Sequence, residues 1–337
     1  MTLATQTAGA PAAPVLPADR PVLSVRDLGV SVMTPSGLRP LVQGMSFGLR
    51  RGETLCIAGE SGSGKSVTSM AIMGLLPPTA KLTGEILFNG VDLLKLSPQE
   101  HNALRGHEIA MIYHDALSSL NPSMLIKAQF KQLTSRGGQR SAEELLELVG
   151  LDPVRTLASY PHELSGGQRQ RVLIAMALTR NPKLVIADEP TTALDVTVQK
   201  QVVDLLNELR TKLGFAMVFV SHDLALVASV AHRITVMYAG QVVETGPTLE
   251  LLTDPRHEYT RGLLGAVLSI ESGSGRLHQV PGVVPSPREF VQGDRFAPRS
   301  SHPTVGLDVR PEMVAVSDTG HRYAAHPDSA YTEEAQR

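Results

Sequence analysis

Cysteine is nearly absent from this sequence, and tryptophan is missing altogether. The 337 residues include one cysteine and no tryptophan, and aromatic side chains make up 4% of the chain. A single thiol cannot form an intramolecular disulfide, and it cannot supply a cysteine cluster for a metal. The one cysteine, Cys56, lies in the apolar run 54–58, so we expect a buried and inert thiol.

A strong charge of either sign is also missing. The 31 Lys and Arg residues and 33 Asp and Glu residues give a net charge of −2. That balance provides no electrostatic footprint for nucleic acid or for an anionic membrane. No apolar run approaches the roughly 20 residues needed to span a bilayer. If the protein acts at a membrane, another subunit must therefore hold it there.

The first residues do not have the pattern of a signal peptide. Residues 1–21 have no basic start and no apolar centre, and they are rich in Ala, Thr and Pro. We therefore expect a disordered leader on a cytoplasmic protein. The chain is longer than one average domain, which predicts a large α/β domain with an appendage.

The most informative stretch is glycine-rich and fits the phosphate-loop pattern G-x-x-x-x-G-K-[ST]. It follows an apolar run and precedes a helical pattern over 67–73, which is the setting that the motif requires. Small residues let backbone N–H groups point inward at phosphate oxygens, beside the positive end of a helix dipole. Lys65 would reach the β and γ phosphates, and the Ser66 hydroxyl would bind Mg²⁺. The ordinary alternative is a glycine-rich turn that opens a helix. The loop consists of Gly59, Glu60, Ser61, Gly62, Ser63, Gly64, Lys65 and Ser66.

Apolar runs and helical patterns alternate in the second half of the chain. The runs 184–187 and 216–220 have the composition of buried parallel strands, and an amphipathic helix over 197–213 lies between them. A β-hairpin over 234–244 follows. This alternation predicts a doubly wound α/β core with a parallel sheet.

Three further regions flank this core. Short β-type runs between residues 22 and 49 predict an antiparallel sheet, and 84–90 has the pattern of a strand that ends in an Asn-Gly turn. Residues from about 96 to 164 are mostly helical in pattern, with a capping box at 141–144. The tail from about residue 246 has many Pro and Gly residues and little periodicity, so we expect a partly irregular appendage.

Polar groups follow the predicted strands at several points. Asp188 and Glu189 end the run 184–187, where Asp188 would hold Mg²⁺ and Glu189 would act as general base on the attacking water. Alternatively, two acidic residues cap the next helix. His222 follows the run 216–220, and a lone histidine there is more often structural. Farther upstream, a Ser hydroxyl and glycine amides at a helix start form a second anion cradle, made of Ser165, Gly166, Gly167 and Gln168.

In their order and spacing, these motifs resemble those of the ATP-binding cassette (ABC) ATPases over about residues 22–246. The string 164–168 is similar to the family signature LSGGQ, which binds the γ phosphate held by an opposing cassette. The resemblance implies that two cassettes enclose two ATP molecules. It also implies that His222 contacts the γ phosphate and that Asp195, in 193–195, contacts the other subunit.

The resemblance also implies a fold and a division into domains. We expect a P-loop NTPase, the ABC cassette, with a parallel core sheet, an N-terminal antiparallel β subdomain, a helical signature subdomain and an irregular C-terminal appendage. The leader would be 1–21, the ABC ATPase domain 22–250 with its helical subdomain at about 96–164, and the C-terminal extension 251–337.

The tail resembles one branch of the family, the ATPases of oligopeptide, dipeptide and nickel importers. The segments 253–264 and 280–287 carry this resemblance, and 118–122 and 160–163 are also similar to that branch. It implies uptake of peptides or peptide-like solutes, driven from the cytoplasmic face of the cell membrane. The implied partners are a second ABC ATPase chain in a heterodimer, two transmembrane permease subunits and an extracytoplasmic solute-binding protein.

Three departures from the family pattern stand out. His114 takes the place of the glutamine of the Q-loop, which reaches Mg²⁺ and the attacking water and couples the site to the membrane subunit. We hypothesise that His114 makes turnover or coupling sensitive to pH near neutrality.

Phe47 is the only aromatic residue before the phosphate loop and is misplaced for stacking on adenine, so Leu38 or a neighbour would pack there. Asp294 and Ser300 stand where some relatives have the cysteines of an iron–sulfur cluster, so we expect no cluster here.

Two other readings compete with an active importer ATPase. A cassette protein of translation control would carry two cassettes in one chain, and one of DNA repair would carry a long coiled-coil insertion. Neither feature is present in this sequence. The other reading is a regulatory cassette that binds ATP and hydrolyses it weakly beside an active second ATPase.

Overall fold

The computed structural model describes residues 20–35, 37–135, 137–192, 194–272 and 280–325. Most of the predicted leader, residues 1–19, lies outside the described residues, and so does Ala193 of the predicted dimer contact. No helix among the described residues combines the length and the apolar character that a membrane crossing requires.

The centre of the molecule is an eight-stranded sheet in the order β11-β12-β10-β9-β3-β8-β7-β6. The pairs β6–β7, β7–β8, β8–β3 and β3–β9 are parallel, and the pairs beyond β9 are antiparallel. The predicted parallel core is therefore confirmed. Its strands are β3 (Thr54–Ala58), β6 (Ile109–Ile112), β7 (Leu184–Asp188), β8 (Ala216–Ser221) and β9 (Arg233–Tyr238); the antiparallel extension consists of β10 (Gln241–Pro247), β11 (Glu312–Ala315) and β12 (Arg322–Ala325).

A second, antiparallel sheet with the order β2-β1-β4-β5 packs on one face of the central sheet. Its strands are β1 (Leu23–Thr34), β2 (Gly37–Leu49), β4 (Lys81–Phe88) and β5 (Val91–Asp92). The expected antiparallel sheet is present, but the short runs are joined into two long strands. Pro40 lies inside β2 opposite Ser31, and this is possible because β2 is an edge strand.

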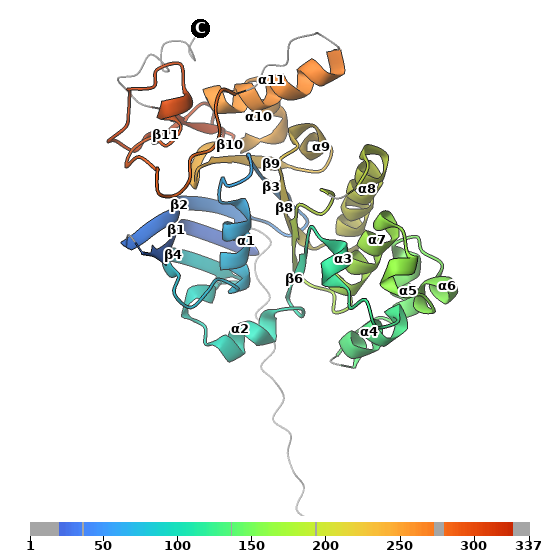
Figure 1. Ribbon diagram of the computed structural model, residues 1–337. Coiled ribbons are helices and arrows are strands. Elements are labelled where there is room, and N and C mark those ends of the chain that lie inside the picture. Colours follow the sequence, from blue (N-terminus) through green and yellow to red (C-terminus); the bar gives the residue numbers. More distant parts are fainter. Residues whose placement is uncertain (1–19, 36, 136, 193, 273–279, 326–337) are drawn as a thin grey trace, which may run out of the picture.

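Alternating side chains of the central strands divide the core into two layers. Leu55 and Ile57 of β3 pack with the antiparallel sheet and with helix α1 (Lys65–Met73). Cys56 and Ala58 face the opposite layer, and burial raises the pKa of the Cys56 thiol, as expected for an inert cysteine. The opposite layer contains the helices α7 (Gly166–Ala177), α8 (Val196–Leu213) and α9 (Leu224–Ala228), as Figure 1 shows.

The region predicted as mostly helical contains one strand that the sequence analysis missed. Strand β6 pairs in parallel with β7, so the core sheet extends into this region. Four residues, Ile-Ala-Met-Ile, are too short a run for periodicity to separate strand from helix. The helices are α2 (Pro98–Leu104), α3 (Ala116–Ser119), α4 (Ile126–Thr134), α5 (Ala142–Leu148) and α6 (Pro153–Leu157), and the capping box at Ser141 and Glu144 is confirmed.

The C-terminal region continues the central sheet. It contributes α10 (Thr248–Thr253), α11 (Glu258–Ser272), a short 3-10 turn (Ala297–Arg299) and the hairpin β11–β12, whose strand β12 pairs with β10. The appendage is therefore partly irregular, as expected, since residues 280–311 contain only this 3-10 turn. Its short strands gain regularity by adding to a sheet edge, which a local sequence pattern does not reveal.

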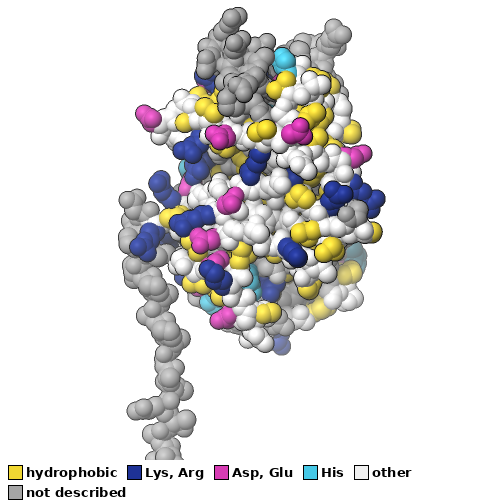
Figure 2. Space-filling view, turned by 90° about the vertical axis from the view of Figure 1, so that its left-hand side faces the viewer, with side chains coloured by type: hydrophobic (Ala, Val, Ile, Leu, Met, Phe, Trp, Pro, Cys, Tyr) yellow, Lys and Arg dark blue, Asp and Glu magenta, His cyan; other side chains and the backbone are white. Residues whose placement is uncertain are grey.

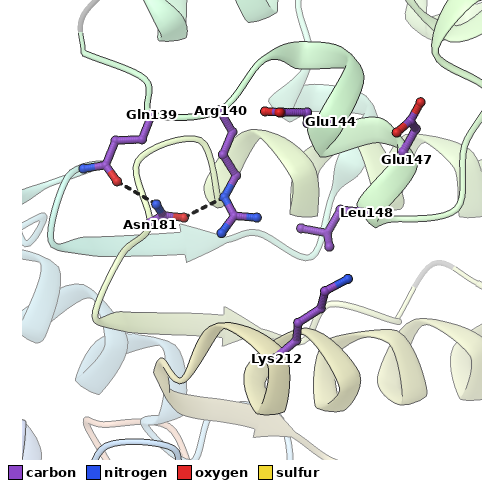
Figure 3. Close-up of a pocket in the computed structure, with 7 residues that line it drawn as sticks. All are labelled: Gln139, Arg140, Glu144, Glu147, Leu148, Asn181 and Lys212. Atoms are coloured by element: carbon purple, nitrogen blue, oxygen red, sulfur yellow. Dashed lines mark hydrogen bonds between the residues drawn. The ribbon is translucent and has the colours of Figure 1, made fainter.

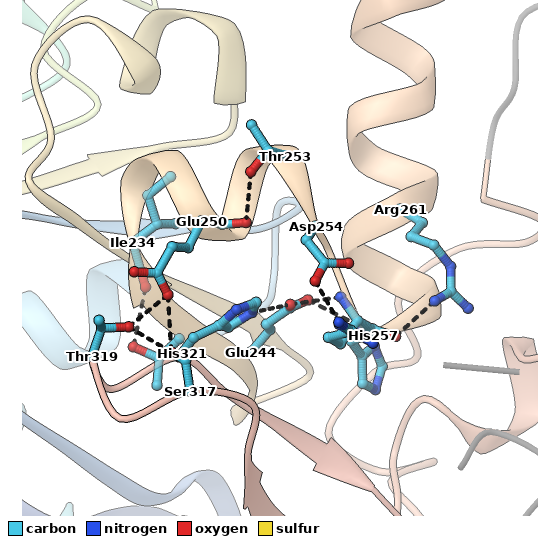
Figure 4. A network of polar contacts seen from close by, with 12 residues as sticks. Ile234, Glu244, Glu250, Thr253, Asp254, His257, Arg261, Ser317, Thr319 and His321 are labelled. Atoms are coloured by element: carbon cyan, nitrogen blue, oxygen red, sulfur yellow. Dashed lines mark hydrogen bonds and ion pairs between the residues drawn. The ribbon is translucent and has the colours of Figure 1, made fainter. Parts of the chain in front are cut away.

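A buried carboxylate fastens this region to the sheet. Glu244 of β10 is fully buried and accepts hydrogen bonds from the backbone N–H groups of Arg256 at 2.7 Å and His257 at 3.0 Å. His321 Nε2 lies 2.8 Å from its Oε1 atom. Figure 4 shows Glu244 between His257 and His321, and it shows Glu250 accepting hydrogen bonds from the Ser317 and Thr319 hydroxyls.

Candidate functional site

The phosphate-loop residues form a tight turn between β3 and α1. Gly59 has a φ of 147°, and a Cβ atom at this position would lie 2.2 Å from the carbonyl oxygen of Met237. Only glycine therefore fits the start of the loop. The strand, loop and helix predicted around the motif are confirmed.

Lys65 lies at the centre of this turn with its side chain 4% exposed. Its Nζ atom donates to the carbonyl oxygens of Gly59 at 2.8 Å and Glu60 at 2.9 Å, and it lies 3.6 Å from Glu189 Oε1. Desolvation lowers the pKa of Lys65, while the charge of Glu189 acts in the opposite direction. A buried ammonium group of this kind fits a phosphate, whose charge would compensate the desolvation.

Ser66 and Asp188, the residues expected to hold a divalent cation, lie within hydrogen-bonding distance of each other. Ser66 Oγ donates to Asp188 Oδ1 at 3.1 Å, and both oxygens belong to the ligand class that Mg²⁺ prefers. Burial raises the pKa of Asp188, and the hydrogen bond from Ser66 opposes that shift. A cation at Asp188 would replace the missing solvation, so the two residues fit the metal predicted from the sequence.

Glu189 follows Asp188 in an uncommon backbone conformation. Its φ is 47°, in the left-handed region that non-glycine residues rarely occupy, and its N–H group donates to Val220 O at 3.0 Å. Its carboxylate accepts a hydrogen bond from the Thr192 hydroxyl at 2.9 Å and lies 3.3 Å from His222 Nδ1. The structure thus brings together Glu189, the predicted general base, and His222, the residue predicted to contact the γ phosphate.

The pairing of Glu189 with His222 predicts a pH dependence of stability. The hydrogen bond with Glu189 raises the pKa of His222 above its ordinary value of 6.5. The stabilisation that protonated His222 gives to the folded state is therefore complete below pH 6.5, and it is lost as the pH rises through the raised pKa. The hydrogen bond with His222 lowers the pKa of Glu189 from 4.5 to about 2, so that contribution is lost only as the pH falls toward about 2.

We therefore expect the pair to stabilise the fold most between about pH 4.5 and pH 6.5. In urea unfolding, the free energy of unfolding should be lower at about pH 8.5 than at about pH 6. This pair should account for less than ~1 kcal/mol of the difference, because His222 is half exposed. Glu189→Gln should reduce that difference. An unchanged difference in this variant would contradict the pairing.

His114, the predicted Q-loop residue, is exposed directly after β6. Its charge, when protonated, lowers the pKa of Asp188, although burial dominates and raises it. His114 therefore lies within electrostatic reach of the predicted metal site.

The signature residues form a second, separate set of contacts on the other side of the central sheet from α1. Ser165 is the N-cap of α7, where its hydroxyl accepts from Gln168 N at 3.3 Å and its own N–H donates to Gln168 Oε1 at 2.9 Å. Gly166 and Gly167 form the first turn of the helix. Ser165 and Gly166 are exposed, so this helix start is open to a ligand from outside the chain.

Asp195 belongs to this second set. Its carboxylate accepts from Val198 N at 2.9 Å, so Asp195 is the N-cap of α8. The next residue, Val196, is 82% exposed.

The close packing of α7 against α8 predicts an effect of Gly167→Ala. A Cβ atom at Gly167 would lie 2.7 Å from Val198 Cγ1, so the signature helix would have to shift. We expect weaker ATP-dependent dimerisation, by roughly 10-fold in Kd, because the anion cradle moves with the helix. Analytical ultracentrifugation with ATP in a Glu189→Gln background would measure it. Gly48→Ala is the control, since Gly48 has no positive φ and the nearest atom to its added methyl group, Pro21 Cβ, lies at an ordinary contact distance of 3.8 Å.

One recess of the surface lies away from these residues. It has a volume of about 620 Å³ and contains none of the predicted site residues. Figure 3 shows Asn181 holding Gln139 and Arg140 at one end, with Lys212 of α8 on the other side. Figure 2 shows basic and acidic side chains interspersed on the face that carries the antiparallel sheet, rather than a basic stripe.

Several residues that contact the phosphate loop were missed in the sequence. Tyr259 and Arg299 touch Glu60, and Gly240 N donates to Ser63 O at 2.8 Å. All three come from the chain after β9, and their distance in sequence from the loop left no local signal. The geometry that did follow from the sequence is the cluster at the carboxyl ends of β3, β7 and β8, which is where ligands bind in open α/β sheets.

Comparison with known proteins supports this geometry. Residues 42–192 match the family described as "ABC transporter", and residues 243–304 match "Oligopeptide/dipeptide transporter, C-terminal region". The chain is 47% identical over 326 residues to the oligopeptide transport ATP-binding protein OppD of Bacillus subtilis (strain 168), covering 93% of this chain and 91% of the relative. It is 46% identical over 292 residues to the dipeptide transport ATP-binding protein DppD of Escherichia coli (strain K12), covering 84% and 89%.

A solved structure extends the comparison to the fold. The dimeric ATP-binding cassette MJ0796, in a post-hydrolysis state bound to ADP and Pi, matches with a TM-score of 0.59 and 27% identity, covering 67% of this chain and 98% of that one. The two matched families, the two relatives and the solved structure all agree with a phosphate loop that has carboxylates beside it. The chain is therefore an ATPase of the ABC transporter family, in the branch that carries the oligopeptide/dipeptide transporter C-terminal region.

Proposed function

We propose that this chain hydrolyses ATP to drive the uptake of peptides or peptide-like solutes through separate membrane subunits. The observation that carries the proposal is the meeting of Lys65, Glu189 and His222 in one cluster, in a chain that also has the oligopeptide-type C-terminal region. Its place would be the cytoplasmic face of the cell membrane, bound peripherally to those subunits.

In this proposal the residues of one chain divide the chemistry of hydrolysis. The loop Gly59–Ser66 surrounds the phosphates with N–H groups, and Lys65 neutralises the β and γ phosphates. Ser66 and Asp188 would hold Mg²⁺, which would supply positive charge beside the phosphates. Glu189 orients a water molecule and takes its proton as the oxygen attacks the γ phosphorus, while the bond to ADP breaks. His222 would donate to the γ phosphate from its second ring nitrogen, Nε2, since Nδ1 faces Glu189.

The second set of contacts supports a dimer. Residues Ser165, Gly166, Gly167 and Gln168 would bind the γ phosphate of ATP held by the partner cassette, with Asp195 at the contact between the two. Since α1 and α7 lie on opposite faces of the central sheet, one ATP molecule in the phosphate loop does not meet the signature of its own chain. We favour a second, different ABC ATPase chain as the partner.

A groove beside the Q-loop supports contact with a membrane subunit. The groove has a volume of about 550 Å³ and is lined in part by Met111, Ile112 and Tyr113, the three residues before His114. A permease segment in this groove would move His114 relative to Asp188. His114 would in this way couple the membrane subunit to the metal site.

His114→Gln tests this coupling. We expect basal hydrolysis to change only a few-fold, while the stimulation by the membrane subunits and its pH profile change together. His114→Ala should lower the stimulation further, because it removes the hydrogen-bonding side chain. A stimulation and pH profile identical to the wild type in both variants would contradict the role of His114.

The remaining parts of the proposal concern groups that would not be bound. The single cysteine, Cys56, is buried in the core, and Asp294 and Ser300 replace possible cluster ligands, so we propose no iron–sulfur cluster. We also propose no nucleic acid partner, in keeping with the net charge of −2.

Purification of the tagged chain from its native membrane tests the proposal. We expect two transmembrane permease subunits and a second ABC ATPase chain to come with it, and an extracytoplasmic solute-binding protein that binds peptides to stimulate hydrolysis by the complex. Recovery with ribosomes or DNA and without membrane subunits would overturn the transport function. Hydrolysis measured with and without the second ATPase chain would separate an active from a regulatory cassette.

A further inference from the structure

We propose that the C-terminal region is a positioning element of the ATP site, and that Tyr259 and Arg299 act through Glu60 to hold the phosphate loop. The inference rests on the proposed function, because it assigns a role within ATP binding by the same loop. It concerns residues far outside the cassette motifs, in the region matched as "Oligopeptide/dipeptide transporter, C-terminal region".

Glu60 is held by the C-terminal region at two different atoms. Its backbone N–H donates to the Tyr259 hydroxyl at 2.8 Å. Its carboxylate accepts from Arg299, with Nη1 at 2.7 Å from Oε2 and Nη2 at 3.5 Å from Oε1. Such a paired contact fixes direction as well as distance, since the guanidinium group presents its donors in a rigid plane.

The third group of Glu60 belongs to the ATP site itself. Its carbonyl oxygen accepts from Lys65 Nζ at 2.9 Å. The residue that Tyr259 and Arg299 fix is therefore one of the two whose carbonyls bind the phosphate-binding ammonium group. A displacement of Glu60 would move both the loop and the position from which Lys65 reaches a phosphate.

Arg299 and Tyr259 are themselves rigidly supported. The Arg299 side chain is 7% exposed and donates to the carbonyl oxygens of Val280, Pro281 and Gly282. Tyr259 is fully buried and packs edge-on against Tyr238, with 4.9 Å between ring centroids, and against Phe296 at 5.5 Å. These contacts restrict the rotamers of the Arg299 and Tyr259 side chains. The position of Glu60 therefore depends on the position of the C-terminal region.

A second set of contacts from the C-terminal region supports the phosphate loop at Ser63. Arg295, which is 2% exposed, donates to Ala239 O, and the next residue, Gly240, donates from its N–H to Ser63 O at 2.8 Å. The turn Ala239–Gly240 thus transmits the position of Arg295 to the phosphate loop. Figure 1 shows the C-terminal hairpin strand β11 beside β10 and on the same side of the molecule as β2.

The test compares ATP affinity and turnover in variants of the full chain. We expect Arg299→Ala and Tyr259→Phe each to raise the ATP Kd and KM by roughly 10-fold with a much smaller change in kcat, because the chemistry of Glu189 is untouched. Arg299→Lys should recover part of the affinity. Glu60→Ala combined with Arg299→Ala should be no weaker than Glu60→Ala alone, because the pair acts as one contact.

Arg310→Ala is the matched control. Arg310 also joins the C-terminal region to the cassette, but it donates to Gln43 O of β2 at 3.1 Å and does not touch the phosphate loop. We expect its ATP Kd to equal that of the wild type. Equal losses in Arg299→Ala and Arg310→Ala, or a lower melting temperature in Arg299→Ala with unchanged Kd and KM, would overturn the positioning role. Because the wild type is measured in the same assay, a failure of ATP binding itself would be seen separately.

Discussion

Replacing Glu189 by glutamine is expected to lower kcat for ATP hydrolysis by about 10²–10⁴-fold, the range ascribed to a positioned general base. Glutamine has nearly the same shape but cannot accept the proton of the attacking water. The hydrogen bond from Thr192 can persist, and Lys65 keeps its two carbonyl partners. ATP affinity should therefore remain within a few-fold of the wild type, and ATP should hold the dimer closed. Steady-state hydrolysis and equilibrium ATP binding measure the two effects.

Glu53→Gln is a suitable control for this variant. Glu53 is another carboxylate at the edge of the core, where it accepts from Arg50 N at 2.8 Å and lies 3.5 Å from Arg233. It is outside the phosphate-loop cluster, so its kcat should not change. A Glu189→Gln variant that retains more than about a tenth of wild-type kcat would remove Glu189 from the role of general base.

Removal of the Glu244 side chain should have the largest effect on stability. Glu244→Ala would leave two backbone N–H groups and buried His321 without their shared acceptor. Leaving one buried donor without its acceptor costs about 1–3 kcal/mol, and more than one donor loses its acceptor here. We expect a loss of this size in urea unfolding, with earlier exposure of the C-terminal region to proteases.

Two other variants test whether burial is the cause. Glu250→Ala removes a carboxylate that also binds the C-terminal region, through Ser317 and Thr319, but it is only partly buried, whereas Glu244 is fully buried. Its effect should be much smaller. Glu244→Gln keeps one acceptor oxygen and should lie between the wild type and Glu244→Ala. Equal losses for Glu244→Ala and Glu250→Ala would contradict the assignment of Glu244 as the main anchor.

The parts of the fold that could be predicted are those in which local pattern and tertiary role agree. Strands β7 and β8 are buried on both sides, so their composition alone identified them. The phosphate loop, the acidic pair after β7 and the end of α8 at Gly214 also follow from short-range stereochemistry. Asp188, Glu189 and His222 could be brought together because parallel strands end at one edge of a sheet.

The parts that could not be predicted depend on partners distant in the chain. Strand β6 is only four residues long and exists because β7 offers an edge. Strand β12 likewise pairs with β10 more than 70 residues earlier in the chain, where His321 meets Glu244. The contact of Arg299 with Glu60 spans 239 residues. Neither residue has a neighbour in sequence that would indicate the other.

Transport in reconstituted vesicles tests the central claim most directly. The complex isolated with this chain would be placed in vesicles with peptide-loaded binding protein on the outer side of the permease and ATP on the side of the cassettes. We predict ATP-dependent peptide accumulation with the wild-type chain, and none above background with Glu189→Gln in this chain. Accumulation that continues unchanged with Glu189→Gln, or ATP hydrolysis that never responds to loaded binding protein, would contradict a role of this chain in powering peptide uptake.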